Sequence, residues 1–310
     1  MNIAAIGRTE IMYKSIELLV ESGFKVSLII TSKESIESTK TANDFKVLAN
    51  EIGAKYICTS KLNNRENIEL IKSCGRIDIA ISINFSSIIS QKIIDMFRFG
   101  ILNAHGGDLP KYRGNACQAW AIINGEERIA LCIHSMIGGE VDSGNIVDRE
   151  YINIDINTKI TEVWSWISKR TPYMFLKSIE KYQNNEDVIL EVQSKNTSEM
   201  LRCYPRIPED GKIDWSKSNC QILRLVNATN KPYSGAYCYY NDKKMTVWDA
   251  ELVDDTEVYL SEVGQIAAIN EDGSIDVITG NGKIKINITE YEEYIGMPNK
   301  FIKSIRKRLK

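Results

Sequence analysis

The chain has 310 residues, of which 43% are hydrophobic and 26% are charged, and its formal net charge is −2. This composition is typical of a globular protein, and the near balance of charge excludes a global field that would attract a nucleic acid. The first twenty residues lack a basic segment followed by a long apolar run, so we expect no signal peptide, no membrane span and a cytoplasmic location.

In the first third of the chain, apolar and β-rich runs alternate with segments of helix length. The runs cover residues 3–6, 25–30, 55–58, 77–83 and 100–104. This alternation predicts parallel strands joined by crossover helices in a doubly wound, Rossmann-like α/β sheet. Gly7 follows the first run without starting a G-x-G-x-x-G pattern, so no dinucleotide site is expected.

A long helix is expected next, near residues 158–182. Apolar residues recur there at helical spacing from Ile160 to Ile167, which predicts a stripe that faces the core. Pro172 lies inside this segment and is expected to kink or break the helix. Polar stretches at residues 183–187 and 196–199 then predict a linker.

The last third of the chain reads as a second, β-rich domain. Short alternating runs cover residues 236–240, 244–248, 264–269, 274–278 and 283–288. Asp272 with Gly273, and Asn281 with Gly282, are strong hairpin signals between them. We therefore predict a small β-barrel or sandwich, with a first domain at residues 1–190 and a second at residues 200–310.

Two features of composition bear on metals and on the C-terminal tail. The seven cysteines are scattered and never form a C-x-x-C pair, which predicts reduced, partly buried thiols and no structural metal. The tail from Lys303 to Lys310 is basic, and we interpret it as the solvated end of a C-terminal helix rather than as a nucleic-acid contact.

The candidate chemistry centres on one of the only two histidines in the sequence. His105 ends an apolar run, the position at which open α/β sheets place their ligand sites. Asn103 lies two residues earlier, so on a strand both side chains share one face. Asp142 lies in the glycine-rich run GGEVDSGNIV, where a carboxylate could orient an imidazole. From these residues alone, an active site and an ordinary structured strand end both remain open.

Three motifs follow each other in order around these residues. They are Asn103-Ala-His105, the run LPKYRG that begins at Leu109, and Asp142-x-Gly-x-Ile. Together they resemble the signature of the folate-dependent formyltransferases. The runs RIPEDGKIDW from Arg206 and KPYSGA from Lys231 are similar to the C-terminal OB-like barrel of methionyl-tRNA formyltransferases and of nucleotide-sugar N-formyltransferases.

The resemblance implies a reaction and roles for three residues. The donor would be N10-formyltetrahydrofolate, the acceptor a primary amine, and no metal would take part. Asn103 would stabilise the oxyanion, since its amide N–H can donate to it. His105 would act as general base, and Asp142 would orient His105 and favour its protonated form.

By the same resemblance, main-chain groups of two segments would grip the pterin of the folate. These residues are Phe85, Ser86, Ser87, Ile88, Ile89, Gly138, Gly139 and Val141. Simple core packing is the alternative for Phe85 and Ile88. His134 corresponds to a histidine of several sugar formyltransferases, and we interpret it as a satisfied, half-buried residue.

Two acceptors compete, a UDP- or dTDP-linked amino sugar and the methionyl group of initiator tRNA. The segment after the second strand is short and balanced in charge, and residues 249–300 carry many acids, including Asp249 and Asp255; both features favour the sugar over a polyanion. A catalytically inactive folate- or nucleotide-binding module is the alternative outside enzymes. The resemblance also suggests a homodimer and a place in glycan assembly.

Candidate contacts to the acceptor follow from its chemistry. A pyrophosphate needs cations and a base needs an aromatic face. The candidates are Lys111, Arg113 and Arg206 for phosphate, Tyr204 or Tyr233 for the base, and Gly107, Asp108 and Tyr112 in the loop beside the acceptor. Asp108 would contact the sugar or its amine, and for Arg113 a structural role that ties its loop to the sheet is the alternative.

Overall fold

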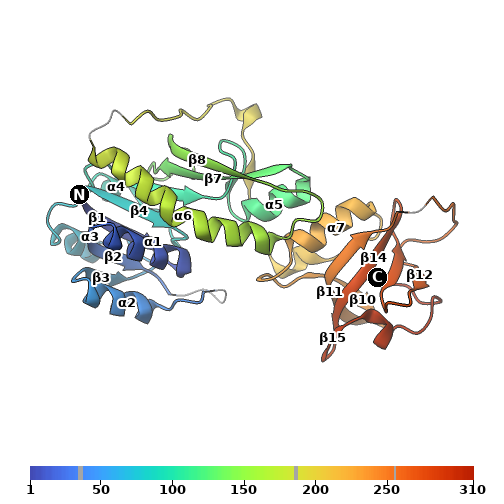
Figure 1. Cartoon of the computed structure of the whole chain (residues 1–310). Helices are drawn as coiled ribbons and strands as arrows, with labels where there is room; N and C mark the ends of the chain where they lie inside the picture. The colour runs from blue at the N-terminus through green and yellow to red at the C-terminus, as the bar shows by residue number, and fades with distance from the viewer. Residues whose placement is uncertain (34–37, 185–187, 255) are drawn as a thin grey trace. The chain divides into compact units, whose positions relative to one another are not determined.

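The computed structural model describes residues 1–33, 38–184, 188–254 and 256–310, and the chain forms two compact units (Figure 1). The first unit comprises Met1–Gly114, Ala130–Ile152 and Trp164–Cys203, and the second comprises Asn115–Ile129, Asn153–Val163 and Tyr204–Lys310. Residues 185–187 of the expected linker, residues 34–37 after the second strand, and Asp255 lie outside the described residues. The domain boundary between residues 190 and 200 stays a prediction.

The first unit is built on a sheet of seven described strands in the order β3-β2-β1-β4-β5-β7-β8. The strands are β1 (Asn2–Gly7), β2 (Lys25–Thr31), β3 (Lys55–Cys58), β4 (Ile79–Ile83), β5 (Ile101–His105), β7 (Arg128–Ser135) and β8 (Ile146–Asn153). The chain starts in β1, moves outward to β3 and then returns to the other side of β1 with β4, so the strand order reverses between β1 and β4. The Rossmann-like α/β fold is therefore confirmed.

The sheet is mixed rather than wholly parallel. The strands from β3 to β5 pair in parallel, as the alternating pattern predicts, whereas β7 pairs antiparallel with β5. The five predicted runs are therefore parallel as expected, and β7, which lies outside them, makes the sheet mixed. Its apolar run IALCIHS has the same composition whichever way the strand runs, and only the pairing with β5 decides its direction.

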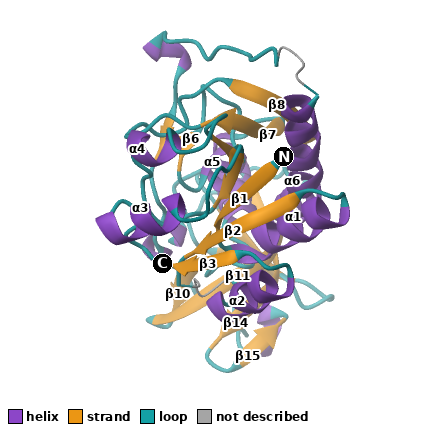
Figure 2. Ribbon diagram, turned by 90° about the vertical axis from the view of Figure 1, so that its left-hand side faces the viewer, coloured by secondary structure: helices purple, strands orange, loops and turns teal. Residues whose placement is uncertain are grey.

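Helices cover both faces of this sheet (Figure 2). They are α1 (Thr9–Glu21), α2 (Ala42–Glu51), α3 (Arg65–Lys72), α4 (Gln91–Ile94) and α6 (Ile160–Gln183). The ribbon shows α1 and α6 on one face and α3 and α4 on the other. On the second face, Ile68 and Ile93 pack against Ile6, Leu28 and other buried strand residues in one apolar cluster.

The helix α6 continues through Pro172, so of the two predicted outcomes the break does not occur and the kink stays a prediction. Ile160, Val163 and Ile167 are buried, which confirms the predicted core-facing stripe. Along the part of α6 in the first unit, Arg170 makes two hydrogen bonds to the carboxylate of Glu150 in β8. Packing of a long amphipathic helix thus outweighs the one backbone hydrogen bond that proline removes.

The second unit contains an antiparallel sheet of six described strands, in the order β10-β11-β14-β13-β12 with β15 beside β14. The strands are β10 (Ala236–Tyr240), β11 (Lys243–Leu252), β12 (Ile266–Ile269), β13 (Ile275–Ile278), β14 (Lys283–Tyr291) and β15 (Tyr294–Gly296). Both predicted hairpins are present, with Gly273 and Gly282 at positive φ in the turns on either side of β13. The helices α5 (Cys117–Asn124) and α7 (Asn219–Ala228) belong to the same unit.

Short pieces complete the chain. They are the paired strands β6 (Arg113–Gly114) and β9 (Arg202–Cys203), and the 3₁₀ turns η1 (Thr197–Glu199), η2 (Pro208–Gly211) and η3 (Pro298–Lys300). No helix of the described residues combines the length and apolarity that a membrane crossing requires.

The basic C-terminal tail is extended and bonded to both edges of the second sheet, so its interpretation as a helix end is wrong. Lys310 and Tyr239 of β10 exchange backbone hydrogen bonds of 2.8 and 3.0 Å, while Leu309 N donates to Gly264 O beside β12 at 2.8 Å. The side chain of Leu309 joins the apolar core of the unit. The tail therefore closes the sheet and satisfies the backbone groups that two open edges would leave exposed.

Candidate active site

The antiparallel pairing of β5 with β7 brings three of the candidate polar side chains together. Asn103 lies opposite His134, and His105 lies opposite Cys132. Asn103 Nδ2 is 3.2 Å from His134 Nε2, and His134 Nδ1 is 2.9 Å from the carbonyl oxygen of Ser135. If Nδ1 carries the proton and donates it to Ser135, Nε2 is left to accept a hydrogen bond from Asn103, which fixes the orientation of that amide.

Asp142 lies between the two imidazoles. Its Oδ2 is 3.4 Å from His105 Nδ1, and its Oδ1 is 3.4 Å from His134 Nε2. The same Oδ2 accepts a 2.9 Å hydrogen bond from the backbone N–H of Gly114. The backbone of Asp142 has a φ of 51°, a left-handed conformation that costs energy in a residue other than glycine. Surrounding contacts must therefore hold this residue in place.

Burial sets the protonation of this cluster. Desolvation lowers the pKa of His105, although Asp142 and the Tyr112 carbonyl oppose this effect. Burial would raise the pKa of Asp142, but the charge that His105 carries once it is protonated, the hydrogen bond and charge of His134, and the Gly114 N–H outweigh it and hold that pKa well below its usual range. At neutral pH the arrangement therefore pairs an uncharged imidazole with an ionised carboxylate.

The second ring nitrogen of His105 is also occupied. Its Nε2 lies 2.6 Å from the carbonyl oxygen of Tyr112, in the loop between β5 and β6. A Cβ on Gly107 would lie 2.3 Å from that oxygen and 2.6 Å from Nε2, so only glycine fits there. Both ring nitrogens of His105 thus face oxygen atoms, and an uncharged imidazole, which has one N–H, can donate to only one of them at a time.

The segments predicted to grip the donor lie beyond the ends of β4 and β7. Phe85 is partly buried and packs against the apolar cluster under the sheet, whereas Ile88 is 59% exposed. The carbonyl of Ile88 accepts a hydrogen bond from Asn63, and the N–H of Gly138 donates to Gln91 Oε1 at 2.8 Å. Core packing, the alternative for Phe85, is therefore observed, and the folate contacts of these segments stay predictions.

Two of the predicted acceptor contacts in the first unit already have partners. Asp108 forms an ion pair with Arg149 and accepts a 3.0 Å hydrogen bond from the Tyr151 hydroxyl. Arg113 donates to Gln193 Oε1 at 2.9 Å. This contact fits the structural alternative for Arg113, which ties its loop to the rest of the unit.

The remaining acceptor candidates divide by exposure and by unit. In the first unit, Lys111 is exposed, whereas the side chain of Tyr112 is buried. In the second unit, the Arg206 guanidinium lies 4.9 Å from the centre of the Trp120 ring, and Tyr204 is largely exposed. Tyr233 is half-buried in the same unit. Contacts of all these residues with an acceptor stay predictions.

The sequence interpretation placed one member of this site less deeply than the structure does and left out another. His134 was expected as a half-buried residue, but it is almost fully buried against Asp142 and Asn103. Gln193, which hydrogen-bonds to the Asp142 loop, was not considered at all. The strand register was the signal for the first, since a strand antiparallel to β5 places His134 opposite Asn103. The second depends on a tertiary contact that the linear sequence does not mark.

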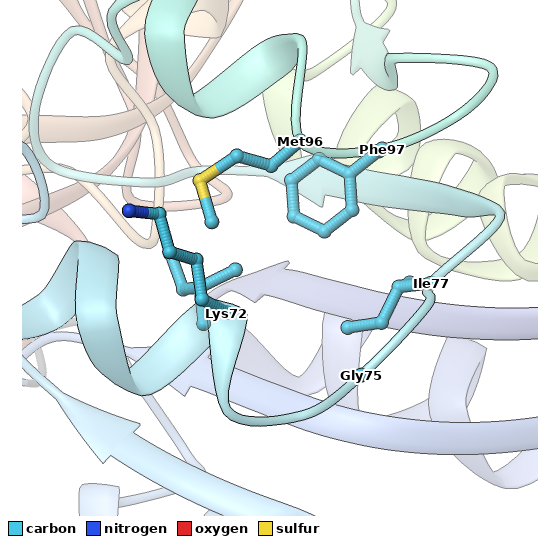
Figure 3. Close-up of a pocket in the computed structure, with 6 residues that line it drawn as sticks. Lys72, Gly75, Ile77, Met96 and Phe97 are labelled. Atoms are coloured by element: carbon cyan, nitrogen blue, oxygen red, sulfur yellow. The ribbon is translucent and has the colours of Figure 1, made fainter.

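A separate cavity lies at the opposite end of the sheet, before β4 begins (Figure 3). It has a volume of about 260 Å³ and is lined by Ile71, Lys72, Gly75, Ile77, Met96 and Phe97. These residues are mostly apolar and include none of the polar candidates. This cavity therefore takes no part in the site at the carboxyl end of the strands.

The family of the chain follows from matches that cover most of its length. Residues 1–179 match the formyl transferase family, and residues 206–304 match the formyl transferase C-terminal domain. The chain belongs to the formyl transferase family. The resemblance in the three motifs is thereby confirmed as membership of this enzyme family.

Individual relatives place the chain within that family. It is 28% identical to a methionyl-tRNA formyltransferase of Agathobacter rectalis over 94% of this chain and 92% of the relative. Its fold is similar to an N-formyltransferase of Helicobacter canadensis, solved with folinic acid and dTDP-3-aminofucose, with a TM-score of 0.67, 20% identity, and coverage of 92% and 98%. It is also similar to HypX of Aquifex aeolicus, with a TM-score of 0.60 and 17% identity over 94% of this chain, but spans only 44% of that protein.

Proposed function

We propose that the chain transfers the formyl group of N10-formyltetrahydrofolate to a primary amine. The observation that carries this proposal is the cluster at the end of β5. Asn103 and His105 come from one motif and Asp142 from another. Asp142 contacts His105 directly, and it is linked to Asn103 through His134. A base, a carboxylate that orients it and an amide donor are the groups that acyl transfer to an amine requires.

In the proposed mechanism, His105 takes a proton from the attacking amine. Its lowered pKa keeps the imidazole uncharged near neutral pH, as a base requires, and Asp142 stabilises the imidazolium once the proton has arrived. In the present arrangement Nε2 faces the carbonyl of Tyr112. The acceptor amine must therefore replace this carbonyl, with a shift of the loop between β5 and β6.

Asn103 serves as the proposed oxyanion donor. In the tautomer that carries its proton on Nδ1, His134 accepts one N–H of the Asn103 amide, which leaves the other N–H for the oxygen of the formyl group as negative charge develops on it. Donors of this kind contribute about 3–4 kcal/mol in other acyl-transfer sites. The amine nitrogen forms the new C–N bond, the C–N bond to the folate breaks, and tetrahydrofolate leaves with a proton.

We infer that the acceptor is a primary amine on a deoxy sugar linked to a nucleotide. The low net charge of the chain supports this acceptor over a polyanion. A further support is the Helicobacter canadensis N-formyltransferase, which has the same fold and was solved with dTDP-3-aminofucose. The second candidate, the methionyl group of initiator tRNA, is favoured by the 28% identity to the Agathobacter rectalis methionyl-tRNA formyltransferase along almost the whole chain.

The test is an acceptor panel with the wild-type chain and N10-formyltetrahydrofolate. Release of tetrahydrofolate and a formyl addition to the product, read by mass spectrometry, are followed for UDP- and dTDP-linked amino sugars and for charged initiator tRNA. We expect turnover with a sugar nucleotide and none in the folded His105→Ala variant. Comparable turnover of the tRNA would overturn the choice of acceptor, and no release with any amine would favour an inactive binding module.

A further inference from the structure

The side chain of Gln193 bridges the two loops that form the candidate active site. It is only 5% exposed, and its Nε2 donates to the carbonyl oxygens of Asp142 at 2.9 Å and of Gly144 at 2.6 Å. Its Oε1 accepts from Nη2 of Arg113 at 2.9 Å. Two carbonyls on one side and a guanidinium on the other permit only one orientation of the amide, so every polar atom of Gln193 is used.

The backbone places Gln193 at this position. Ile146 at the start of β8 exchanges two backbone hydrogen bonds with Glu191, each 2.9 Å long. Ile146 and Glu191 form an antiparallel bridge. Residue 193, two positions after Glu191, therefore lies across from Gly144, two positions before Ile146. A Cβ on Gly144 would lie 1.8 Å from the carbonyl oxygen of Ser135, so this loop is already packed tightly on its other side.

The hydrogen bonds at both ends of the Gln193 amide act on residues that position the carboxylate of Asp142. On one side, Gln193 holds the carbonyls that flank the left-handed turn at Asp142. On the other side it holds Arg113, the neighbour of Gly114, whose backbone N–H donates to Asp142 Oδ2. Among the described residues, Arg113 Nε has no hydrogen-bond partner. The Arg113 guanidinium donates to Gln193 Oε1 and to Met200 Sδ, which is the weaker acceptor.

We propose that Gln193 is a positioning residue, which fixes Asp142 against His105 by donating to both carbonyls of the turn and anchoring the neighbouring loop through Arg113. This inference rests on the proposed function, because it assigns Gln193 to the same reaction centre. Donation to the turn is the decisive part, since a strained turn returns to a commoner conformation when its hydrogen bonds are removed.

The proposal predicts an electrostatic signature at His105. Besides Asp142, the charged or titratable groups that act on His105 are His134 in β7 and Arg202 in β9, and both lower its pKa, as burial does. Asp142 and the Tyr112 carbonyl raise it. Loss of the carboxylate from its place should therefore lower the pKa of His105 further, because an opposite charge nearby favours the protonated imidazole.

The experiment compares three variants with the wild type. Gln193→Ala removes the whole bridge, and Gln193→Glu keeps the acceptor for Arg113 but cannot donate to the two carbonyls. Asn196→Ala is the matched control, since Asn196 lies on the same segment, is exposed, and only caps η1. We expect both Gln193 variants to lose about 100-fold in kcat with little change in KM for the donor, and the control to match the wild type.

A readout independent of turnover separates this inference from the proposed function. With only two histidines in the chain, NMR titration of the ring protons follows His105 directly. We expect the His105 pKa to fall in Gln193→Ala, which adds no charge, and to stay unchanged in Asn196→Ala. Wild-type kcat in folded Gln193→Glu would overturn the proposal even if Gln193→Ala failed to fold, and so would an unmoved His105 pKa in folded Gln193→Ala. If the wild type transfers no formyl group and the His105 pKa still falls in Gln193→Ala, the positioning role of Gln193 is supported and the proposed reaction is refuted.

Discussion

Polar side chains are buried differently at the carboxyl end of the first sheet and in the closed sheet of the second unit. At the first, two buried histidines and a buried glutamine surround a partly buried carboxylate, and they are bonded to backbone from several segments. In the second, the buried polar side chains are mostly uncharged Ser, Thr and Asn residues, and ion pairs such as Lys243 with Glu292 lie on the surface. Buried polar groups are costly unless each is satisfied, so their concentration in one place indicates chemistry rather than stability.

The largest expected effect comes from removing the imidazole or the carboxylate of the first region. His105→Gln and Asp142→Asn keep the shapes of the side chains, yet each should lower kcat by about 10³–10⁴-fold, as loss of an orienting carboxylate does in other acyl-transfer enzymes. Steady-state kinetics of the folded variants measures this loss. Glu150→Gln is the matched control, because that carboxylate binds Arg170 on the surface of the same unit and should leave kcat unchanged.

The next effect concerns the closure of the second sheet. Leu309 is 1% exposed in the apolar core, so Leu309→Ala should lower the free energy of unfolding by about 2–5 kcal/mol. Chemical denaturation of the whole chain measures this change. Ile305→Ala, at a side chain that is 52% exposed on the same tail, should have little effect. Equal losses in the two variants would show that the tail does not close the sheet.

The pH dependence of stability sharpens the comparison further. The native pKa of His105 lies below its ordinary 6.5 and that of Asp142 below its ordinary 3.8, so in both cases the unfolded chain binds more protons. The free energy of unfolding should therefore fall as the pH falls below about 6.5, and again as it approaches 3.8, with at most about 1.4 kcal/mol per pH unit for one group. Denaturation midpoints at several pH values should lose the upper step in His105→Gln. An unaltered profile would contradict the burial of a neutral imidazole.

The smallest effect is expected at the surface of the second unit. Lys243 and Glu292 form an exposed ion pair at the start of β11. Such pairs add almost nothing to stability, since water screens both charges and the side chains lose freedom. Lys243→Ala should leave the thermal unfolding midpoint unchanged, and a clear drop would mean that the second unit also depends on paired charge.

Much of this molecule could be predicted from local sequence patterns. The runs at residues 55–58 and 236–240 coincide with β3 and β10, because alternating or continuous apolar residues between turn signals suit a strand in almost any context. The turns on either side of β13 follow from Asp272 with Gly273 and from Asn281 with Gly282 for the same reason. The tail failed this test, because its basic residues describe its surface and not the backbone partners of Leu309 and Lys310.

The candidate site, like the fold, was predictable from local sequence patterns only in part. By itself, the sequence determined which residues could do the chemistry: the order and spacing of three motifs select Asn103, His105 and Asp142, since motif spacing is a local property. Only the tertiary structure decided which residues hold them in place. The antiparallel pairing of β7 with β5 brings His134 to Asn103. The pairing of Glu191 with Ile146 in β8 brings Gln193 to Asp142. Both contacts join segments far apart in the chain, and their partners are chosen by strand direction and register, which hydrophobic pattern leaves open.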